Sequence, residues 1–253
     1  MTASPPIHVG LFGSSGRMGQ TMISALALHP RLELAYALSR VHMAQPRQCI
    51  SQLDQCDLII DFTTVDAQAQ VFEILSELQS PPPLITGVTG LKQNDQQRLD
   101  TYAQRAPVFW ASNFSLGIAL LKKLSALTAV QLGSDFDIEI FELHHRDKQD
   151  APSGTALTLA QAMQQSMRGA GRDKTTICEQ LTSPRDPDEI HVSVGRGGGV
   201  FGEHRVMFLG GSERLEIKHS ALNRMVFAEG ALRAAEWCLD RSAGRYTMDH
   251  LIG

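Results

Sequence analysis

Residues 7–19 read IHVGLFGSSGRMG, and this stretch decides the fold that the chain is expected to adopt. Its first six residues, Ile7 to Phe12, form a short apolar run typical of a buried strand. Glycines follow at positions 13, 16 and 19, and apolar residues then recur near helical spacing over 17–29. Glycine lets the backbone approach a pyrophosphate, and the helix after it directs free N–H groups and the positive end of its dipole toward the phosphates. A strand, a glycine turn and a helix in this order therefore predict a dinucleotide-binding site.

The rest of the N-terminal half repeats the alternation of short apolar runs and helical patterns. Alternation with such short connections is typical of a doubly wound parallel sheet. The glycines alone also fit a tight turn without a ligand, because glycine serves purely conformational needs as well. Their place between a strand and a helix favours a Rossmann-type α/β domain. The strands are predicted at 32–38, 57–62, 84–86 and 107–111, and the helices near 66–79 and 93–105.

After residue 112 the pattern changes to longer helices and consecutive strands. Strands joined only by turns indicate a second, α+β domain with a mixed or antiparallel sheet. A last helix over 225–239 is expected to return to the first sheet. The predicted division is 1–115 plus 225–253 for the dinucleotide-binding domain and 116–224 for the second domain. Within the latter, helices are expected at 115–132 and 154–167, and strands at 136–143 and near 175–181, 189–195, 200–209 and 213–219.

The composition limits the classes of partner. The chain has 253 residues, of which 43% are hydrophobic and 20% charged, and this is enough for two domains with cores of their own. A net charge of −4 gives no general attraction to nucleic acid or to anionic lipid. The four cysteines form no C-x-x-C pair, so neither a disulfide framework nor a metal site is expected. Residues 1–6 lack a secretory signal pattern and no run of about eighteen apolar residues occurs, so we expect a cytoplasmic protein without a membrane span.

The end of the second predicted strand bears on the choice of dinucleotide. In NAD-binding proteins a carboxylate at this point accepts a hydrogen bond from the ribose 2′-hydroxyl, whereas in NADP-binding proteins an arginine nearby binds the 2′-phosphate. This chain has Ser39 and Arg40 and no carboxylate at that point. Because a hydroxyl and a guanidinium suit a phosphate better than a free diol, NADPH is expected to be preferred, with NADH as the lesser cofactor. An exposed loop arginine without a ligand is the alternative interpretation.

Residues 142–155 read ELHHRDKQDAPSGT and form the densest polar cluster of the chain. Ser153 is a candidate cap for the helix that follows, and the free N–H groups of a helix start suit a carboxylate. His145 and Lys148 suit a second carboxylate. An imidazole or ammonium with a pKa near neutrality can also deliver a proton to an atom that becomes basic as a hydride arrives. The segment therefore predicts a site for a small dicarboxylate, and a solvated basic loop beside a capped helix is the alternative.

The stretch from Glu142 to Ala156, ELHHRDKQDAPSGTA, closely resembles the signature of the 4-hydroxy-tetrahydrodipicolinate reductase (dihydrodipicolinate reductase) family of diaminopimelate and lysine biosynthesis. The resemblance extends over nearly the whole chain. The other motifs that carry it, in order, are GSSGRMG at 13–19, DFT at 61–63, GVTG at 87–90, SNFS at 112–115, GEH at 202–204, and 220–228 with Arg224.

The resemblance implies an oxidoreductase that passes a hydride from a nicotinamide to a cyclic unsaturated dicarboxylate and yields tetrahydrodipicolinate. His144 matches the family's catalytic proton donor or acceptor, and Lys148 matches its proton donor. The resemblance implies that His145, Gly154 and Thr155 bind the substrate, and Ser153, the candidate helix cap beside them, is expected to join them. The family is typically a homotetramer built through the second domain, so residues 116–224 are expected to bind the substrate and to form the oligomer. The expected cofactor-binding residues, including Ser39 from the argument above, are Gly13, Ser14, Ser15, Gly16, Arg17, Met18, Ser39, Arg40, Gly87, Val88, Thr89, Ala111, Ser112, Asn113, Phe114 and Arg224.

The sequence departs from the family pattern at four places that bear on the cofactor or on a loop. The linker 41–56 is short, and Ser39 stands where an acidic residue often precedes the arginine. Val88 stands where a threonine is usual, and Gly197 to Gly199 lies where an acidic residue more often follows a single glycine. None of these departures touches His144 or Lys148. Two other functions stay open: a reductase of another small imine or enamine acid, and a regulatory protein that binds NADPH without turnover. A sensor needs no proton donor, and oxidation of NADPH would separate it from a reductase.

Overall fold

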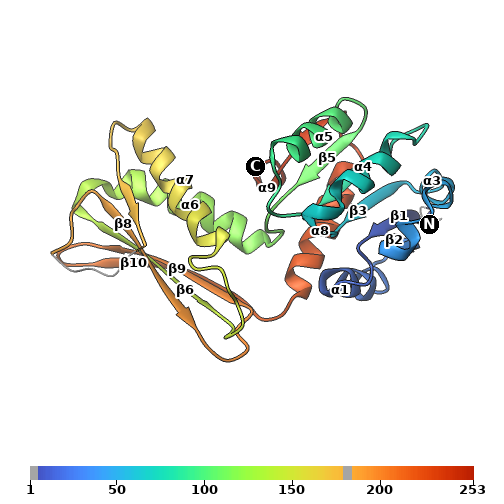
Figure 1. Cartoon of the computed structure of the whole chain (residues 1–253). Helices are drawn as coiled ribbons and strands as arrows, with labels where there is room; N and C mark the ends of the chain where they lie inside the picture. The colour runs from blue at the N-terminus through green and yellow to red at the C-terminus, as the bar shows by residue number, and fades with distance from the viewer. Residues whose placement is uncertain (1–4, 179–183) are drawn as a thin grey trace. The chain divides into compact units, whose positions relative to one another are not determined.

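The structure of the chain is a computed structural model, which describes residues 5–178 and 184–253. The chain divides into unit 1, Met1–Phe114 with Arg224–Gly253, and unit 2, Ser115–Asn223 (Figure 1). Relative to the predicted division, residues 115 and 224 exchange sides. The predicted fold class is confirmed, because one unit holds a parallel sheet and the other a mixed sheet.

Unit 1 is built on a six-stranded sheet of order β11-β5-β4-β3-β1-β2, in which every neighbouring pair is parallel. Helices cover both faces, so a central strand such as β3 is buried at every residue. The order turns at β1, and the crevice at such a turning point is where doubly wound sheets bind ligands. The bounds are Ile7–Phe12 for β1, Leu32–Leu38 for β2, Leu58–Asp61 for β3, Leu84–Thr86 for β4, Pro107–Trp110 for β5 and Gly244–Tyr246 for β11.

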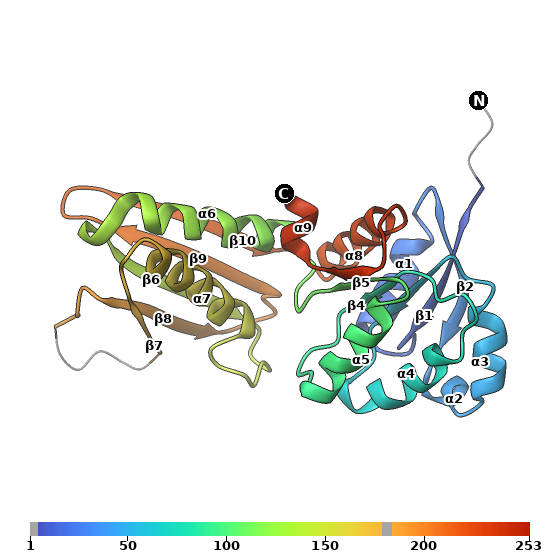
Figure 2. The same ribbon diagram turned by 90° about the horizontal axis from the view of Figure 1, so that it is seen from above.

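The helices of unit 1 form one layer on each face of this sheet (Figure 2). The helices α1 and α8 pack together on one face, and α3, α4 and α5 lie side by side on the other. The last long helix, α8, thus returns to the first sheet as expected. The bounds are Arg17–Leu26 for α1, Arg40–Met43 for α2, Pro46–Leu53 for α3, Gln68–Ser76 for α4 after the 3₁₀ turn Val65–Ala67, Gln93–Ala103 for α5, Met225–Cys238 for α8 and Met248–Ile252 for α9.

Two segments of unit 1 contain regular structure that the sequence did not predict. The linker 41–56 is largely helical, because Pro46 starts α3 and Cys49 and Leu53 reach the core from it. After α8, the short strand β11 adds a sixth strand beside β5, and its Tyr246 packs edge-on against Trp237. Both segments are too short for their periodicity to predict an element, and tertiary packing forms them.

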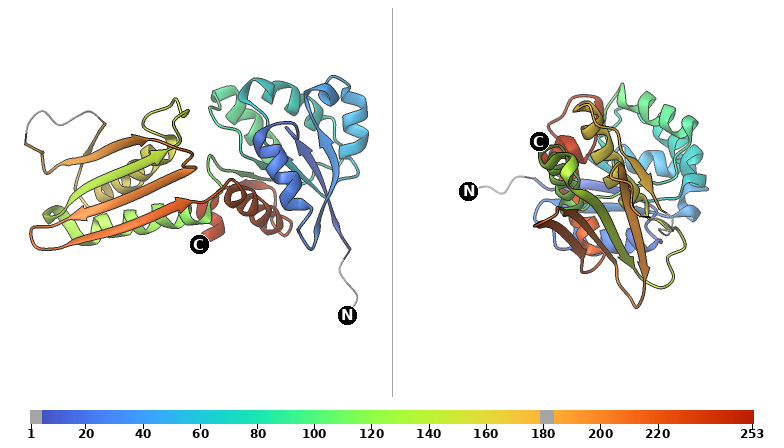
Figure 3. Two further views of the ribbon diagram at one scale, coloured as in Figure 1. Left: turned by 90° about the horizontal axis from the view of Figure 1, so that it is seen from below. Right: turned by 90° about the vertical axis from the view of Figure 1, so that its left-hand side faces the viewer.

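Unit 2 is a five-stranded mixed sheet of order β10-β9-β6-β8-β7 with two helices on one face. Strand β6 pairs with β8 in parallel and with β9 antiparallel, and β9 pairs antiparallel with β10. Figure 2 shows the helices α6 and α7 over the sheet, and the left view of Figure 3 shows the opposite face. The predicted strand near 175–181 is β7 for its first half, and residues 179–181 lie outside the described residues. The bounds are Leu116–Leu132 for α6, followed by the 3₁₀ turn Gly133–Asp135, Asp137–His144 for β6, Gly154–Gly169 for α7, Thr175–Ile177 for β7, Glu189–Arg196 for β8, Gly202–Leu209 for β9 and Arg214–Ala221 for β10.

Helix α6 bears on the expectation that the chain has no membrane span. With the turn after it, residues 116–135 are long and apolar enough to cross a membrane by length and composition, with a mean hydropathy of 1.3. No uninterrupted apolar run occurs there because Lys122 and Lys123 divide it, and an average over the segment tolerates these two charges. The helix packs against α7 and β10 through an apolar stripe that includes Ile118 and Leu121. Most of the segment is nevertheless half-buried or exposed in the structure, and the side chains of Leu120, Leu124 and Leu127 are among the exposed ones.

Candidate active site

The predicted cofactor residues of unit 1 follow the carboxyl ends of neighbouring parallel strands. The glycine turn follows β1, and Phe62 follows β3. These two segments touch, because a Cβ added to Gly13 would lie 2.6 Å from the Phe62 carbonyl oxygen. The Phe62 ring in turn covers Gly87 after β4, where an added Cβ would lie 2.2 Å from a ring carbon. Three segments that are distant in sequence therefore meet at one edge of the sheet.

A buried carboxylate connects two of the segments at this edge of the sheet through hydrogen bonds. Asp61, 1% exposed at the end of β3, accepts hydrogen bonds from the Thr63 amide at 2.9 Å and the Thr63 hydroxyl at 2.7 Å. The side chains of Gln68, at 2.9 Å, and Thr86, at 3.3 Å, donate to the same carboxylate. Burial raises the pKa of Asp61, and these donors oppose the rise. Asp61 thus ties the turn after β3 to the end of β4, a role that its place in a motif did not predict.

The three glycines of the first turn have different reasons to be glycine. Gly13 has a φ of +80°, and a Cβ on Gly19 would lie 2.1 Å from the Gly13 carbonyl oxygen, so the chain itself requires both. A Cβ on Gly16 would meet only that oxygen at 3.4 Å, an ordinary contact. Gly16 is also the N-cap of α1, and no described side chain caps this helix end. The start of α1 therefore combines clearance with backbone N–H groups, which suits a phosphate.

At the end of β2 the two predicted residues have separate environments. The Ser39 hydroxyl lies 2.9 Å from Nδ1 of His42 and caps the short helix α2, so it serves local structure. Arg40 is the first residue of α2 and is exposed. Within the described part of the chain, no ion pair engages its guanidinium. Of the pair, Arg40 is the residue available to a ligand.

The remaining cofactor candidates differ in accessibility. Val88 is only 2% exposed, and its carbonyl oxygen accepts a hydrogen bond from the Trp110 indole at 2.9 Å, so it packs the turn after β4. Arg224 is half-buried and is the N-cap residue of α8. Of the others, Ser15, Arg17, Thr89 and Ser112 are exposed, Met18, Gly87 and Asn113 are half-buried, and Ser14, Ala111 and Phe114 are buried.

In unit 2 the predicted catalytic residues lie at the end of β6 and in the loop after it. Strand β6 alternates buried and half-buried residues, so Ile138, Ile140, Glu142 and His144 share the face covered by helices. The apolar core of this face thus becomes polar toward its carboxyl end. His144 is 8% exposed, and burial lowers its pKa below the ordinary value, while the neighbouring Glu142 carboxylate opposes that shift.

The loop 145–153 carries Lys148 between the end of β6 and the start of α7. Its ammonium Nζ lies 2.7 Å from a carboxylate oxygen of Asp150, and this pairing holds the pKa of Asp150 below its usual range. The hydroxyl of Ser153 accepts a hydrogen bond from the Ala156 amide at 3.2 Å, so Ser153 caps α7 as the sequence suggested. Gly154 is exposed and Thr155 is half-buried in the first turn of α7.

Glu142 lies at the centre of this arrangement and is fully buried. Its carboxylate accepts hydrogen bonds from the Ser153 amide, at 3.1 and 3.2 Å, and from Nη2 of Arg196 at 3.1 Å. Its oxygen Oε2 lies 3.7 Å from Nδ1 of His144 and 3.7 Å from Nε2 of His204. Burial, and next the charge of His144, lower the pKa of His204 to about 4. From the sequence, no role was assigned to Glu142. The feature that could have indicated one is a charged residue at a core position of a strand with alternating burial.

Glu142, His144 and His204 offer ligand atoms within 4.8 Å of one another, a spacing that a metal ion could use. The electrostatics favour a different use. Arg196 already pairs with the carboxylate, and the charge of Lys148 also bears on His144. These two cations oppose a third one at the same place. The cluster is better suited to holding an anion and a proton.

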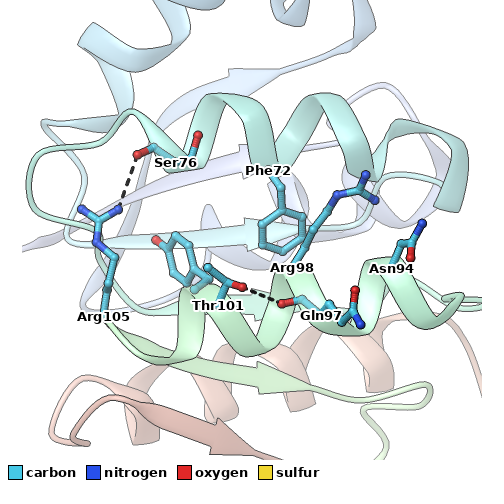
Figure 4. Close-up of a pocket in the computed structure, with 8 residues that line it drawn as sticks. Phe72, Ser76, Asn94, Gln97, Arg98, Thr101 and Arg105 are labelled. Atoms are coloured by element: carbon cyan, nitrogen blue, oxygen red, sulfur yellow. Dashed lines mark hydrogen bonds between the residues drawn. The ribbon is translucent and has the colours of Figure 1, made fainter.

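A groove between α4 and α5 in unit 1 has a volume of about 390 Å³ (Figure 4). Phe72 and Tyr102 form its floor, and both belong to the hydrophobic core of the unit. The arginines at its rim are engaged, since Arg98 pairs with Asp95 at 2.7 Å and Arg105 donates to the Leu78 carbonyl oxygen at 2.9 Å. The groove therefore reflects helix packing and brings no catalytic group together.

Comparison with known families decides the identity of this arrangement. The profile described as "Dihydrodipicolinate reductase, N-terminus" matches residues 7–114, and "Dihydrodipicolinate reductase, C-terminus" matches residues 117–252. The chain belongs to the dihydrodipicolinate reductase family. The family and the oxidoreductase class predicted from the signature residues are thereby confirmed.

Named relatives of this dihydrodipicolinate reductase family protein match along its full length. The 4-hydroxy-tetrahydrodipicolinate reductase of a Nitratiruptor species is 40% identical over 256 residues, covering 98% of this chain and 99% of the relative. The protein of the same name from Zymomonas mobilis is 39% identical over 259 residues, covering 100% of both. Among solved structures, a dipicolinate-bound dihydrodipicolinate reductase from Paenisporosarcina sp. TG-14 superposes with a TM-score of 0.76 at 22% identity, covering 97% of this chain and 99% of that one. That likeness confirms the fold.

Proposed function

We propose that this chain reduces 4-hydroxy-tetrahydrodipicolinate to tetrahydrodipicolinate with NAD(P)H, as a step of diaminopimelate and lysine biosynthesis. The observation that carries the proposal is the cluster at the end of β6, where His144, Lys148 and the start of α7 come together in a chain of the dihydrodipicolinate reductase family. The name shared by the relatives and the dipicolinate bound in the structural neighbour support a cyclic dicarboxylate as the substrate.

The dinucleotide supplies the hydride when it is bound. The segment from Gly13 to Met18 would hold its phosphates, since clearance over Gly16 and the uncapped start of α1 fit a pyrophosphate. The turns 87–89 and 111–114 follow β4 and β5 at the same edge of the sheet and would hold the rest of the cofactor. Phe62 and the hydrogen bonds of Asp61 keep that edge rigid. Arg224 would make a further contact to the cofactor.

NADPH is the preferred cofactor in this proposal. The end of β2 offers no carboxylate for a ribose 2′-hydroxyl. Arg40 is exposed there, and Ser39 supports it indirectly by capping α2 through its hydroxyl. A guanidinium binds a phosphate in a geometry that a diol cannot match. With Arg40→Ala, the KM for NADPH should rise about tenfold, whereas the KM for NADH should stay within a factor of about two. An equal rise for both cofactors would remove Arg40 from this role.

The residues of unit 2 would bind the substrate and supply the proton. The first-turn N–H groups of a helix lack intrahelical acceptors, so the start of α7 at Gly154 and Thr155 suits one substrate carboxylate. His145, from the loop before it, suits the other. Lys148 carries an ammonium in the same loop and can donate a proton to the ring atom that becomes basic on reduction. His144, buried beside Glu142, can hold or pass on that proton.

The direct test is loss of NADPH absorbance with substrate made in situ from pyruvate and aspartate semialdehyde by the preceding synthase. Oxidation that requires both the synthase and this protein is the expected result. NADPH binding without oxidation would support the sensor and contradict the reductase. Oxidation with another cyclic imine acid, and none with this substrate, would keep the reaction class and overturn the substrate.

The assembly proposed with this function is a homotetramer in the cytoplasm, built through unit 2. What supports it is the sheet face opposite α6 and α7, which no described element of unit 2 covers (Figure 3). Phe141 and Leu143 of β6 and Met207 and Leu209 of β9 line that face and remain half-buried. The family resemblance supports the tetramer as the number of copies.

A further inference from the structure

The carboxylate of Glu142 links every part of the unit 2 site and belongs to no role assigned so far. A core position on β6 would normally hold an apolar residue, as Ile138 and Ile140 do on the same face. Removing a carboxylate from water costs several kcal/mol, and the partial burial of its guanidinium partner adds to that cost, which stability alone rarely repays. The Glu142–Arg196 pair therefore calls for a reason other than stability.

The two partners of this pair hold both ends of the segment before α7. Glu142 accepts from the Ser153 amide, at the residue where the helix begins. Arg196 donates to the Asp150 carbonyl oxygen at 2.5 Å and to the Glu142 carboxylate at 3.1 Å. Lys148 lies just before these fixed points and pairs with the Asp150 side chain. The pair thus determines where the ammonium and the helix start lie relative to the end of β6.

The same carboxylate faces the imidazole of His144. Its oxygen Oε2 lies 3.7 Å from Nδ1, a buried nitrogen that has no hydrogen-bond partner among the described residues. The other ring nitrogen, Nε2, faces Gly202, where an added Cβ would lie 3.1 Å away. A carboxylate on the Nδ1 side favours the proton there and leaves Nε2 for exchange. The remaining charged or titratable groups that act on this ring are Lys148, Asp150, Arg196 and His204.

We propose that Glu142, held by Arg196, is the positioning residue of this active site. It orients the imidazole of His144 and stabilises its protonated form, and it fixes the start of α7 for the substrate carboxylate. The inference rests on the roles proposed above for His144 and for α7. It assigns Glu142 no contact with substrate or cofactor.

Two conservative variants distinguish the effect of the charge of Glu142 from the effect of the length of its side chain. Glu142→Gln keeps an oxygen for the Ser153 amide and removes the negative charge. The limb of the pH profile of kcat that reports His144 should then move to lower pH by about one unit, because the opposite charge within 4 Å is lost. Glu142→Asp keeps the charge and shortens the side chain. Its pH limb should stay near that of the wild type, while the KM for the dicarboxylate should rise about tenfold as the contact to α7 is lost.

Glu139 provides a matched control on the same strand. It lies on the other face of β6 and accepts from Arg185 at 3.0 Å and from the Ser193 hydroxyl at 2.5 Å. Glu139→Gln makes the same change of charge, and its pH profile and KM should equal those of the wild type. If Glu142→Gln behaves like this control, or if Glu142→Asp binds substrate as the wild type does, the inference is overturned. If one of the two Glu142 variants does not fold, the other tests the inference on its own. An inactive wild type would instead refute the proposed function.

Discussion

At the scale of single residues, Lys148 is the side chain on which the proposed chemistry depends most. Lys148→Met keeps most of the length of the side chain and removes the ammonium. Turnover should fall about 10²–10⁴-fold, the usual contribution of a positioned general acid, with NADPH affinity unchanged. Steady-state kinetics and a fluorescence titration of NADPH measure the two quantities. Arg146→Met is the control, because Arg146 is an exposed cation of the same loop without an assigned role. Equal turnover in both variants would exclude Lys148 as the donor.

His204 provides a prediction about stability and pH. Burial lowers its pKa to about 4 in the folded chain, against an ordinary value of 6.5. Between these values the unfolded chain binds more protons, so the free energy of unfolding falls as the pH drops from 6.5 toward 4. The loss is at most about 3 kcal/mol. Burial also lowers the pKa values of His144 and His219, so they contribute in the same direction.

His204→Gln removes this titration and keeps a polar side chain beside Ser153. Denaturant unfolding at pH 7 and at pH 4.5 should therefore show a smaller loss for the variant than for the wild type. Groups remote from His204 titrate equally in both proteins and cancel in the comparison, whereas His144, whose charge acts on His204, does not cancel fully. Identical losses in both would show that His204 is protonated in the folded chain at low pH.

At the scale of elements, the glycine turn and α1 show how far sequence alone could go. The strand, the turn and the helix were predicted at 7–12 and from 17 onward, and the structure has them there. The sequence could not assign a reason to each glycine. Gly13 and Gly19 are required by the packing of the turn. Of the three glycines, only Gly16 has space beside its Cα that no other part of the chain fills.

This difference between the glycines is testable. Gly16→Ala should fold like the wild type and bind NADPH at least about tenfold more weakly, because its Cβ enters the proposed phosphate cradle. Gly19→Ala should instead lower the melting temperature, because its Cβ would lie 2.1 Å from the Gly13 carbonyl oxygen. Thermal unfolding and NADPH titration distinguish the two effects. Wild-type NADPH affinity in a folded Gly16→Ala protein would contradict the assignment of the turn.

The site in unit 2 was predictable only in part, for a physical reason. His144, Lys148 and Ser153 belong to one short segment, so their types and order pointed to acid–base chemistry. Arg196 and His204 reach the same place from β8 and β9, through the pairing of those strands with β6. Such register is a property of the folded sheet, and no local pattern encodes it. The helices α2 and α3 were not predicted for a related reason. They are stabilised by packing against the rest of the unit, and they are too short to show a periodic pattern in the sequence.

At the scale of the whole molecule, two surfaces of unit 2 compete as the interface between copies. One is the uncovered sheet face with Phe141 and Met207. The other is the stripe of Leu120, Leu124 and Leu127 on α6, which are 49%, 39% and 57% exposed. The spacing of these leucines, four and three residues apart, places them on one side of the helix. A homotetramer through the sheet requires the first surface to be buried between copies.

A charge placed on each surface tells them apart. Met207→Arg should reduce the tetramer to smaller species in analytical ultracentrifugation, because a longer side chain repeated at every copy would disturb the packing between copies. The isolated subunit can accept that charge, since Glu139 and Glu216 flank Met207 in the register of the sheet. Leu127→Lys should leave the tetramer intact. The opposite pattern would move the interface to α6, where a second copy would cover the exposed side chains of Leu120, Leu124 and Leu127. A monomer in the wild type would refute the tetramer itself.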